Sequence, residues 1–143
     1  MRVAESSPES LIFLIGTKAQ YIKTAPVLRA LDQHGVPYRI VDLGQHARFS
    51  IGLRHELGVR EPDIHLGSRS DIATIPRALM WAASLAALAL RTKVLRERVM
   101  GGLSGVAVVH GDTPSTLIGA LLARRAGLRL AHLEAGLRSF RIL

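Results

Sequence analysis

The sequence predicts an α/β domain built on a doubly wound parallel sheet, and two observations carry this prediction. Continuous apolar runs, such as residues 11–15 and 106–110, alternate along the chain with segments of helical periodicity. Runs without an alternating polar face are typical of parallel strands that helices cover on both sides. The chain has 143 residues, 48% of them hydrophobic, and is long enough for one such domain with its own core.

The amino-terminal half of the chain is expected to form a strand, a helix and a second strand. Residues 1–10 are polar and should form a tail, so the domain itself is placed at residues 11–143. Pro26 deprives the helix of one hydrogen bond, which predicts that its regular part begins around residues 24–26. The expected elements are a strand at 11–15, a helix at 19–34 and a strand at 38–43, joined by a right-handed crossover.

The second half adds a short helix, a loop, a long helical segment and two further strands. The loop at residues 60–70 is inferred from its Glu-Pro-Asp and Gly-Ser sequences. Apolar residues at helical spacing cover residues 72–99, and the basic, amphipathic second part of this segment is expected to face solvent. The remaining elements are helices at 49–57 and 114–126 and strands at 106–110 and 128–133, with glycines at 58, 101, 102 and 127 as stop signals.

The charge of the chain favours an anionic partner. Its net charge is +8, from 19 Lys and Arg against 11 Asp and Glu. Nucleic acid is disfavoured, because only 4% of residues are aromatic and the basic residues are dispersed. A phosphorylated small molecule fits the charge as well, and a purely solubilising surface is the alternative explanation.

Composition also excludes or disfavours several other classes of protein. The chain has no cysteine, which excludes disulfides and thiolate metal sites, and its histidines lack metal-ligand spacing, so no metal is expected. The longest apolar run, residues 78–90, is shorter than the ~18–20 residues that span a bilayer. The opening segment lacks the basic start and apolar core of a signal peptide. We therefore expect a cytoplasmic protein that does not bind a membrane.

Two carboxylates are expected at one edge of the sheet. Asp112 follows the strand at 106–110, and Glu134 follows the strand at 128–133. Neighbouring parallel strands end at the same edge, which is where open α/β sheets bind ligands. The alternative is a structural role, in which Asp112 caps a helix and Glu134 pairs with Arg138.

The turn after residue 110 is expected to start a helix directly. Thr113 is the predicted N-cap, because its hydroxyl can accept a hydrogen bond from the first helical turn. Pro114 suits the first helical position, where its missing N–H costs nothing. Asp112 is thereby placed between the strand and the helix.

The turn after the first strand, residues 16–20, is a second candidate for binding. It contains a single glycine, so it matches neither the G-x-G-x-x-G pattern of dinucleotide sites nor the P-loop pattern. Its backbone N–H groups, with Lys18 and Lys23 near the helix start, can hold a phosphate or steer a sugar nucleotide. An ordinary turn with solvated lysines is the alternative.

Four motifs follow one another in the order and at about the spacing of a known family. They are Gly-Thr-Lys-Ala-Gln-Tyr-Ile-Lys-Thr-Ala-Pro-Val-Leu at 16–28, Gly-Gln-His at 44–46, Val-His-Gly-Asp-Thr at 109–113 and His-Leu-Glu-Ala-Gly-Leu-Arg-Ser at 132–139. Together they resemble the UDP-N-acetylglucosamine 2-epimerase family. The resemblance implies a Rossmann-like domain, the amino-terminal half of a two-domain, glycosyltransferase-B type fold. The family continues with a Pro-Glu-Glu segment, so the chain is expected to be a fragment that stops before the second domain.

The resemblance implies an isomerase of polysaccharide biosynthesis that needs no cofactor. Family members invert C2 of UDP-N-acetylglucosamine by eliminating UDP, forming a glycal and adding UDP back with a proton on the other face. Some relatives hydrolyse the intermediate, but the non-hydrolysing type is favoured here. The expected partners are the UDP-sugar, a carboxy-terminal domain on the same or a separate chain, and a second copy in a homodimer. By similarity, the catalytic residues are Asp112 and Glu134, and the substrate-binding residues are Lys18, Lys23, Gln45, His46, Thr113 and Arg138.

The chain departs from the family pattern in three places. Lys18 stands where an arginine is common, Ala19-Gln20 replaces Pro-Glu, and Ala47 replaces another arginine. Lysine offers a point charge where arginine offers a planar fork that grips a diphosphate. These departures favour a divergent branch with another sugar nucleotide or outcome. They also leave open a non-catalytic sugar-nucleotide-binding or interaction domain that acts with a separate partner chain.

Four side chains near the motifs also have structural interpretations. Gln45 and His46 either contact the ligand or an effector, or form a polar pair in a loop. His110 and His132, each on a strand, are expected to be buried and hydrogen-bonded rather than catalytic.

Overall fold

A five-stranded parallel sheet forms the centre of the domain. The structure, a computed structural model, describes residues 10–45, 47–67 and 72–136, in which the strand order is β3-β2-β1-β4-β5. This order reverses direction at β1, as in doubly wound folds, and it confirms the predicted fold class. The strands are β1 (Ser10–Ile15), β2 (Tyr38–Asp42), β3 (Ile64–His65), β4 (Gly105–His110) and β5 (Arg129–Leu133).

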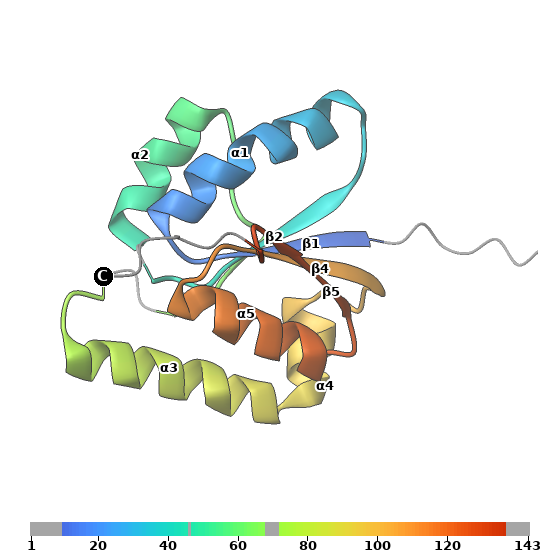
Figure 1. Cartoon of the computed structure of the whole chain (residues 1–143). Helices are drawn as coiled ribbons and strands as arrows, with labels where there is room; N and C mark the ends of the chain where they lie inside the picture. The colour runs from blue at the N-terminus through green and yellow to red at the C-terminus, as the bar shows by residue number, and fades with distance from the viewer. Residues whose placement is uncertain (1–9, 46, 68–71, 137–143) are drawn as a thin grey trace, which may run out of the picture.

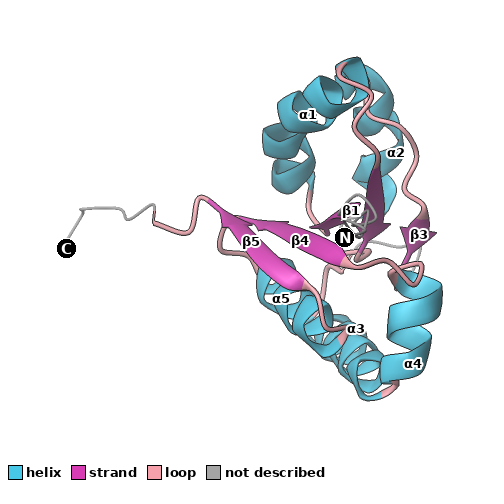
Figure 2. Ribbon diagram, turned by 90° about the vertical axis from the view of Figure 1, so that its right-hand side faces the viewer, coloured by secondary structure: helices cyan, strands magenta, loops and turns pink. Residues whose placement is uncertain are grey.

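Helices cover both faces of the sheet, which Figures 1 and 2 show from two directions. The first face carries α1 (Lys18–Gln33) and α2 (Ala47–Leu57). The second face carries three helical elements and α5 (Pro114–Arg125). The three are α3 (Ile75–Leu90), α4 (Thr92–Val94) and the π-helix η1 (Leu95–Val99).

Side chains of β1 alternate between two separate cores, which explains its continuous apolar sequence. Phe13 and Ile15 pack in the core under α1. Ile12 and Leu14 pack in the larger core, together with residues of α3, η1 and α5. All four side chains are at most 2% exposed, so a polar residue at any of these positions would lie in a core.

The start of α1 differs from the prediction. The regular helix was expected to begin around residues 24–26, but it begins at Lys18, so that prediction is wrong. Thr17 and Gln20 form a capping box that starts the helix about two turns earlier. Pro26 lies inside the helix on an exposed side, where water can replace the hydrogen bond that the proline removes.

The long helical segment expected at 72–99 is broken, which corrects a second prediction. The chain bends by 91° between α3 and the segment 92–99. No proline or glycine marks the bend, but it lets Trp81 and Leu85 of α3 and Leu95 of η1 all enter the larger core. Among the described residues, no single helix is long and apolar enough to cross a membrane; this bent pair passes only when its parts are counted together.

Other differences are small and lie at edges. The expected loop at 60–70 contains β3, a two-residue strand too short to leave a periodic pattern. Strand β1 begins at Ser10, one residue inside the expected tail, and the rest of that tail lies outside the described residues. The predicted helices at 49–57 and 114–126 and the strand at 128–133 agree with α2, α5 and β5 to within two residues.

Gly16 tests the close packing of the turn after β1. A Cβ at this position would lie 2.5 Å from Ser115 Cβ, and Ser115 is fully buried. We expect Gly16→Ala to lower the free energy of unfolding by about 1–3 kcal/mol, because the two turns must move apart. Gly52→Ala is the control, since a Cβ there meets no atom within 4 Å in the middle of α2. It should raise stability by about 0.5–1 kcal/mol; similar losses for both in urea unfolding would contradict this account.

Candidate functional site

The predicted site residues gather at the edge where the parallel strands end. β4 pairs with β5 so that His110 lies opposite Leu133, and the turns that carry Asp112 and Glu134 follow directly. On the other side of β4, the turns after β1 and β2 lead to Lys18 and Gln45. The expected placement of both carboxylates at one edge therefore agrees with the structure.

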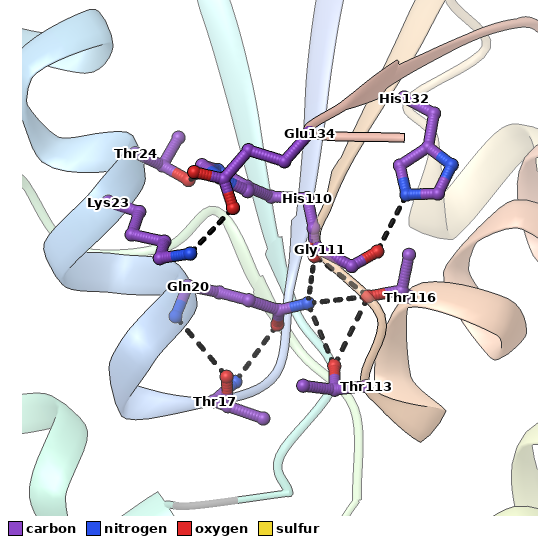
Figure 3. A network of polar contacts seen from close by, with 10 residues as sticks. All are labelled: Thr17, Gln20, Lys23, Thr24, His110, Gly111, Thr113, Thr116, His132 and Glu134. Carbon is purple, nitrogen blue, oxygen red and sulfur yellow. Dashed lines mark hydrogen bonds and ion pairs between the residues drawn. The ribbon is translucent and has the colours of Figure 1, made fainter. Parts of the chain in front are cut away.

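Glu134 is the centre of a polar cluster formed by Lys23, Thr24, His110 and Glu134, which we call the Glu134 cluster (Figure 3). Lys23 Nζ lies 2.5 Å from Glu134 Oε2. His110 Nε2 lies 3.3 Å from the same oxygen, and His110 Nδ1 lies 3.1 Å from Thr24 Oγ1. The cluster thus joins α1, β4 and the residue after β5.

The electrostatics of the cluster keep Glu134 ionised. The hydrogen bond from the Lys23 ammonium group holds the pKa of Glu134 below its usual range, against partial desolvation, and His110 adds to this effect. The alternative pairing with Arg138 falls on a residue outside the described part of the chain; in the structure Glu134 pairs with Lys23.

The backbone of Glu134 is also unusual. Its φ is 62°, and it is the single non-glycine residue with positive φ among those described. A residue with a Cβ pays about 1–2 kcal/mol in this left-handed region. This conformation ends β5 and allows the side chain to turn back over the end of β4 toward α1 (Figure 3).

Asp112 is exposed on the turn between β4 and α5. Its carboxylate makes no hydrogen bond or ion pair within the described ranges, and α5 has no side-chain cap. The capping alternative for Asp112 is therefore not seen. Thr113 occupies the predicted N-cap position, but its hydroxyl contacts Ser115 and Thr116 rather than the helix backbone.

Gln20 holds the two turns of the site together, and sequence analysis missed this role. Its side chain is 3% exposed. Oε1 accepts hydrogen bonds from the backbone N–H groups of Gly16 and Thr17, at 2.8 and 3.1 Å. Nε2 donates to the carbonyl of His110 at 2.8 Å and to the hydroxyls of Thr113 and Thr116. We call this set the Gln20 tether (Figure 3).

The tether gives a structural role to one departure from the family pattern, the glutamine at position 20 in place of glutamate. One atom of the amide must accept and the other must donate, which fixes its orientation and suits glutamine. The Thr17-x-x-Gln20 spacing of a capping box was the available sequence signal. What the sequence could not show is that the same amide also reaches residues 90 to 96 positions away.

The remaining predicted residues are only partly described. Lys18 is the first residue of α1 and is exposed. Gln45 follows β2, and its Oε1 atom is buried without a hydrogen-bond partner in the described residues. His46 and Arg138 lie outside the described residues, so their predicted roles stay predictions.

The two strand histidines differ from each other. His110 is 7% exposed and hydrogen-bonded through Nδ1, as expected of a buried histidine. His132 is exposed, so the prediction that it is buried is wrong. β5 is one of the two edge strands of the described sheet, and the His132 ring bonds the carbonyl of Gly111, with Nε2 and O 2.6 Å apart.

No metal-binding group is visible in the described part of the chain. Histidine, aspartate and glutamate side chains there form no cluster of three or more that could hold an ion. The cationic groups near the edge, above all Lys23, instead suit an anionic organic ligand.

Comparison with known proteins places this chain in a family. The family model described as UDP-N-acetylglucosamine 2-epimerase matches residues 29–142. The chain belongs to this family. Among curated relatives, it is 35% identical over 133 residues to the UDP-2,3-diacetamido-2,3-dideoxy-D-glucuronate 2-epimerase of Pseudomonas aeruginosa and 30% identical over 134 residues to the UDP-N-acetylglucosamine 2-epimerase of Methanocaldococcus jannaschii. Each match covers 91% of this chain but only 34% and 33% of the relative, so the chain spans about a third of their length.

Solved structures of the family share the fold. The crystal structure of the Methanocaldococcus jannaschii UDP-GlcNAc 2-epimerase, in complex with UDP-GlcNAc and UDP, matches 92% of this chain with a TM-score of 0.72 and 31% identity. The Neisseria meningitidis UDP-GlcNAc 2-epimerase bound to UDP-GlcNAc matches 92% with a TM-score of 0.68 and 25% identity. The chain covers 34% and 33% of these structures, and the Rossmann-like fold is confirmed.

Gln20 provides a test of how the site is held. We expect Gln20→Ala to lower the free energy of unfolding by about 2–4 kcal/mol, because it leaves the buried N–H groups of Gly16 and Thr17 without a partner and removes one of the two hydrogen bonds that the His110 carbonyl accepts. Gln33→Ala, at the exposed last position of α1, is the matched control and should change stability by less than about 0.5 kcal/mol. Urea unfolding measures both, and an equally small effect of Gln20→Ala would show that the tether does not stabilise the fold.

Proposed function

We propose that the chain supplies the amino-terminal part of the active site of a UDP-N-acetylglucosamine 2-epimerase, an isomerase that inverts C2 of its UDP-sugar. The observation that carries the proposal is the ionised Glu134, held at the sheet edge beside Lys23 with Asp112 on the neighbouring turn. Membership of the epimerase family supports it. The non-hydrolysing outcome, with UDP added back to the sugar, is part of the proposal.

The chemistry of the reaction matches the groups at this edge. The C2 proton of the sugar is weakly acidic, so a positioned base is needed, and such a base contributes ~10²–10⁴ in rate. Glu134 or Asp112 would take or return this proton from one face of the ring. Lys23 and Lys18 would stabilise the negative charge of the departing diphosphate, with Gln45, His46, Thr113 and Arg138 as further substrate contacts.

Lys23 would have two partners during such a reaction. In the structure it neutralises Glu134, and its side chain is half exposed. A diphosphate bound at Lys23 would compete with Glu134 for the ammonium group. Glu134 would then become a stronger base, because its pKa would rise when the hydrogen bond from Lys23 is lost.

A second domain is part of this proposal. The chain spans about a third of its relatives, and we propose that the remaining part, on the same or a separate chain, forms the second half of a glycosyltransferase-B type cleft and holds the uridine. A closed cleft would keep water from the glycal and hold UDP beside it, and positioning of this kind lowers the activation barrier by up to about 7–11 kcal/mol.

A homodimer is also part of the proposal. Large apolar side chains that are exposed on α3 and α5 support self-association: Ile75, Leu79, Met80 and Leu117.

The need for a second domain can be tested by proton exchange. Residues 1–143 alone, incubated with UDP-N-acetylglucosamine in deuterated water, should exchange no C2 proton by NMR. A fusion of this chain to the remaining part of the Methanocaldococcus jannaschii relative should exchange it, and Asp112→Asn or Glu134→Gln in the fusion should slow exchange by at least about 100-fold. Exchange by the isolated chain above its Asp112→Asn control would contradict the requirement for a second domain. A fusion that binds UDP but exchanges nothing would favour the non-catalytic binding domain.

Lys18 tests contact with the diphosphate. Lys18→Arg should preserve or improve affinity for UDP, because a planar fork replaces a point charge, and Lys18→Ala should weaken it. Calorimetric titration of UDP into the fusion and its two variants measures this. Equal affinities for all three would show that Lys18 does not contact the diphosphate.

A further inference from the structure

We propose that His110 is a positioning residue that holds the Glu134 carboxylate in place while Lys23 binds the diphosphate, and that Thr24 sets the tautomer of His110. The proposal rests on the proposed function, since it concerns the base of the same reaction. It assigns roles to two side chains that the sequence analysis did not connect with the site.

Among the described residues, Glu134 is the acceptor that lies next to the second ring nitrogen of His110. His110 is buried at the end of β4, and its Nδ1 atom contacts the Thr24 hydroxyl of α1. Nε2 is buried and makes no aligned hydrogen bond within the described residues, while Glu134 Oε2 lies 3.3 Å away. A buried nitrogen of this kind is costly unless paired, so the carboxylate and the ring favour each other.

The tautomer of His110 follows from its two neighbours. The Thr24 hydroxyl can donate a hydrogen bond to Nδ1, which places the ring proton on Nε2. That N–H group then lies next to a carboxylate oxygen, an acceptor without a proton, with Nε2 and Oε2 3.3 Å apart. The opposite tautomer would set the lone pair of Nε2 against Glu134 Oε2 and would be repelled.

Lys23 and His110 both lie beside Oε2 of Glu134, but their side chains differ in mobility. The Lys23 side chain is 51% exposed on a flexible stem and can turn to an anionic ligand. The His110 side chain is 9% exposed, and its ring is fixed by Thr24, so it stays in place when Lys23 moves. His110 would therefore keep the Glu134 carboxylate in position after the ion pair between Lys23 and Glu134 is broken. Among the described residues, the charged or titratable groups near the ring are Lys23 on α1, Glu134 after β5 and Asp112, two residues after His110; His132 of β5 bonds the Gly111 carbonyl.

NMR of residues 1–143 tests the cluster without any need for activity. Long-range nitrogen–proton spectra should show His110 protonated on Nε2 in the wild type and in Thr24→Ser, with a mixture of tautomers in Thr24→Val. His110→Phe should raise the midpoint of the Glu134 carboxyl titration by about half a pH unit or more, because a donor is lost. His110→Gln, which can still donate, and His132→Gln should leave the midpoint nearly unchanged. A wild-type proton on Nδ1, or a Glu134 midpoint unaffected by His110→Phe, would overturn the proposal.

Kinetics of the fusion protein test the functional half. His110→Phe should lower kcat for C2 exchange by about 10- to 100-fold with KM changed less than twofold, since the base is misplaced but binding is kept. His110→Gln should recover most of the rate. If His110→Phe does not fold, Thr24→Val serves in its place. Thr24→Val should lower kcat, whereas Thr24→Ser, which keeps the hydroxyl, should not. Unchanged kcat in folded His110→Phe or Thr24→Val would refute the positioning role. An inactive wild-type fusion would instead count against the proposed function, and the NMR results would then decide the arrangement of the cluster alone.

Discussion

A single buried amide determines how the edge of this sheet is built. The turn after β1 presents two buried backbone N–H groups, and the turn after β4 presents the carbonyl of His110, which the Thr116 hydroxyl satisfies only in part. Gln20 satisfies groups on both sides at once, through the N–H groups of Gly16 and Thr17 and the carbonyl of His110. Loss of the amide would leave the turn after β1 with two unpaired buried N–H groups and would break its link to the turn after β4, where Thr116 would remain the donor to the His110 carbonyl.

The same interaction sets the direction in which α1 presents its polar residues. Residues three and four positions apart lie on one face of a helix, so Lys23 and Thr24 share the face of Gln20. Once Gln20 is fixed to the end of β4, that face is turned toward His110 and Glu134. The Glu134 cluster is thus a geometric result of helical spacing and one tether.

The neighbouring residue, Tyr21, fixes α1 to the other side of β1. Its hydroxyl donates to Asp42 at the end of β2, and burial together with Asp42 raises the pKa of Tyr21. Asp42 also accepts from the N–H of Gly44 and lies 3.7 Å from the buried Arg54 of α2. Gln20 and Tyr21, which are adjacent in α1, therefore bind the turn after β4 and the end of β2. The turn after β2 leads to Gln45.

How much of the fold and of the candidate site could be predicted depends on how far apart in the sequence the interacting residues lie. Apolar periodicity identified the main strands and most helices, because β1 and β4 are buried on both faces and α5 has ordinary start and stop residues. The strand β3 and the bend at Arg91 were missed, since two residues carry no period and the bend is set by the packing of Trp81 and Leu95. The pairing of Lys23 with Glu134, 111 residues apart, follows from strand order and not from any local pattern.

The left-handed backbone of Glu134 has a consequence for how this domain can change under selection. Glycine or asparagine would adopt a φ of 62° at less cost, but glycine lacks a carboxylate and asparagine has a shorter, neutral side chain. A search for more thermostable variants would favour such substitutions at this position and would remove the acid in doing so. Under the proposed function, selection for stability and selection for activity would therefore favour different residues at position 134, as is common for strained residues at functional sites.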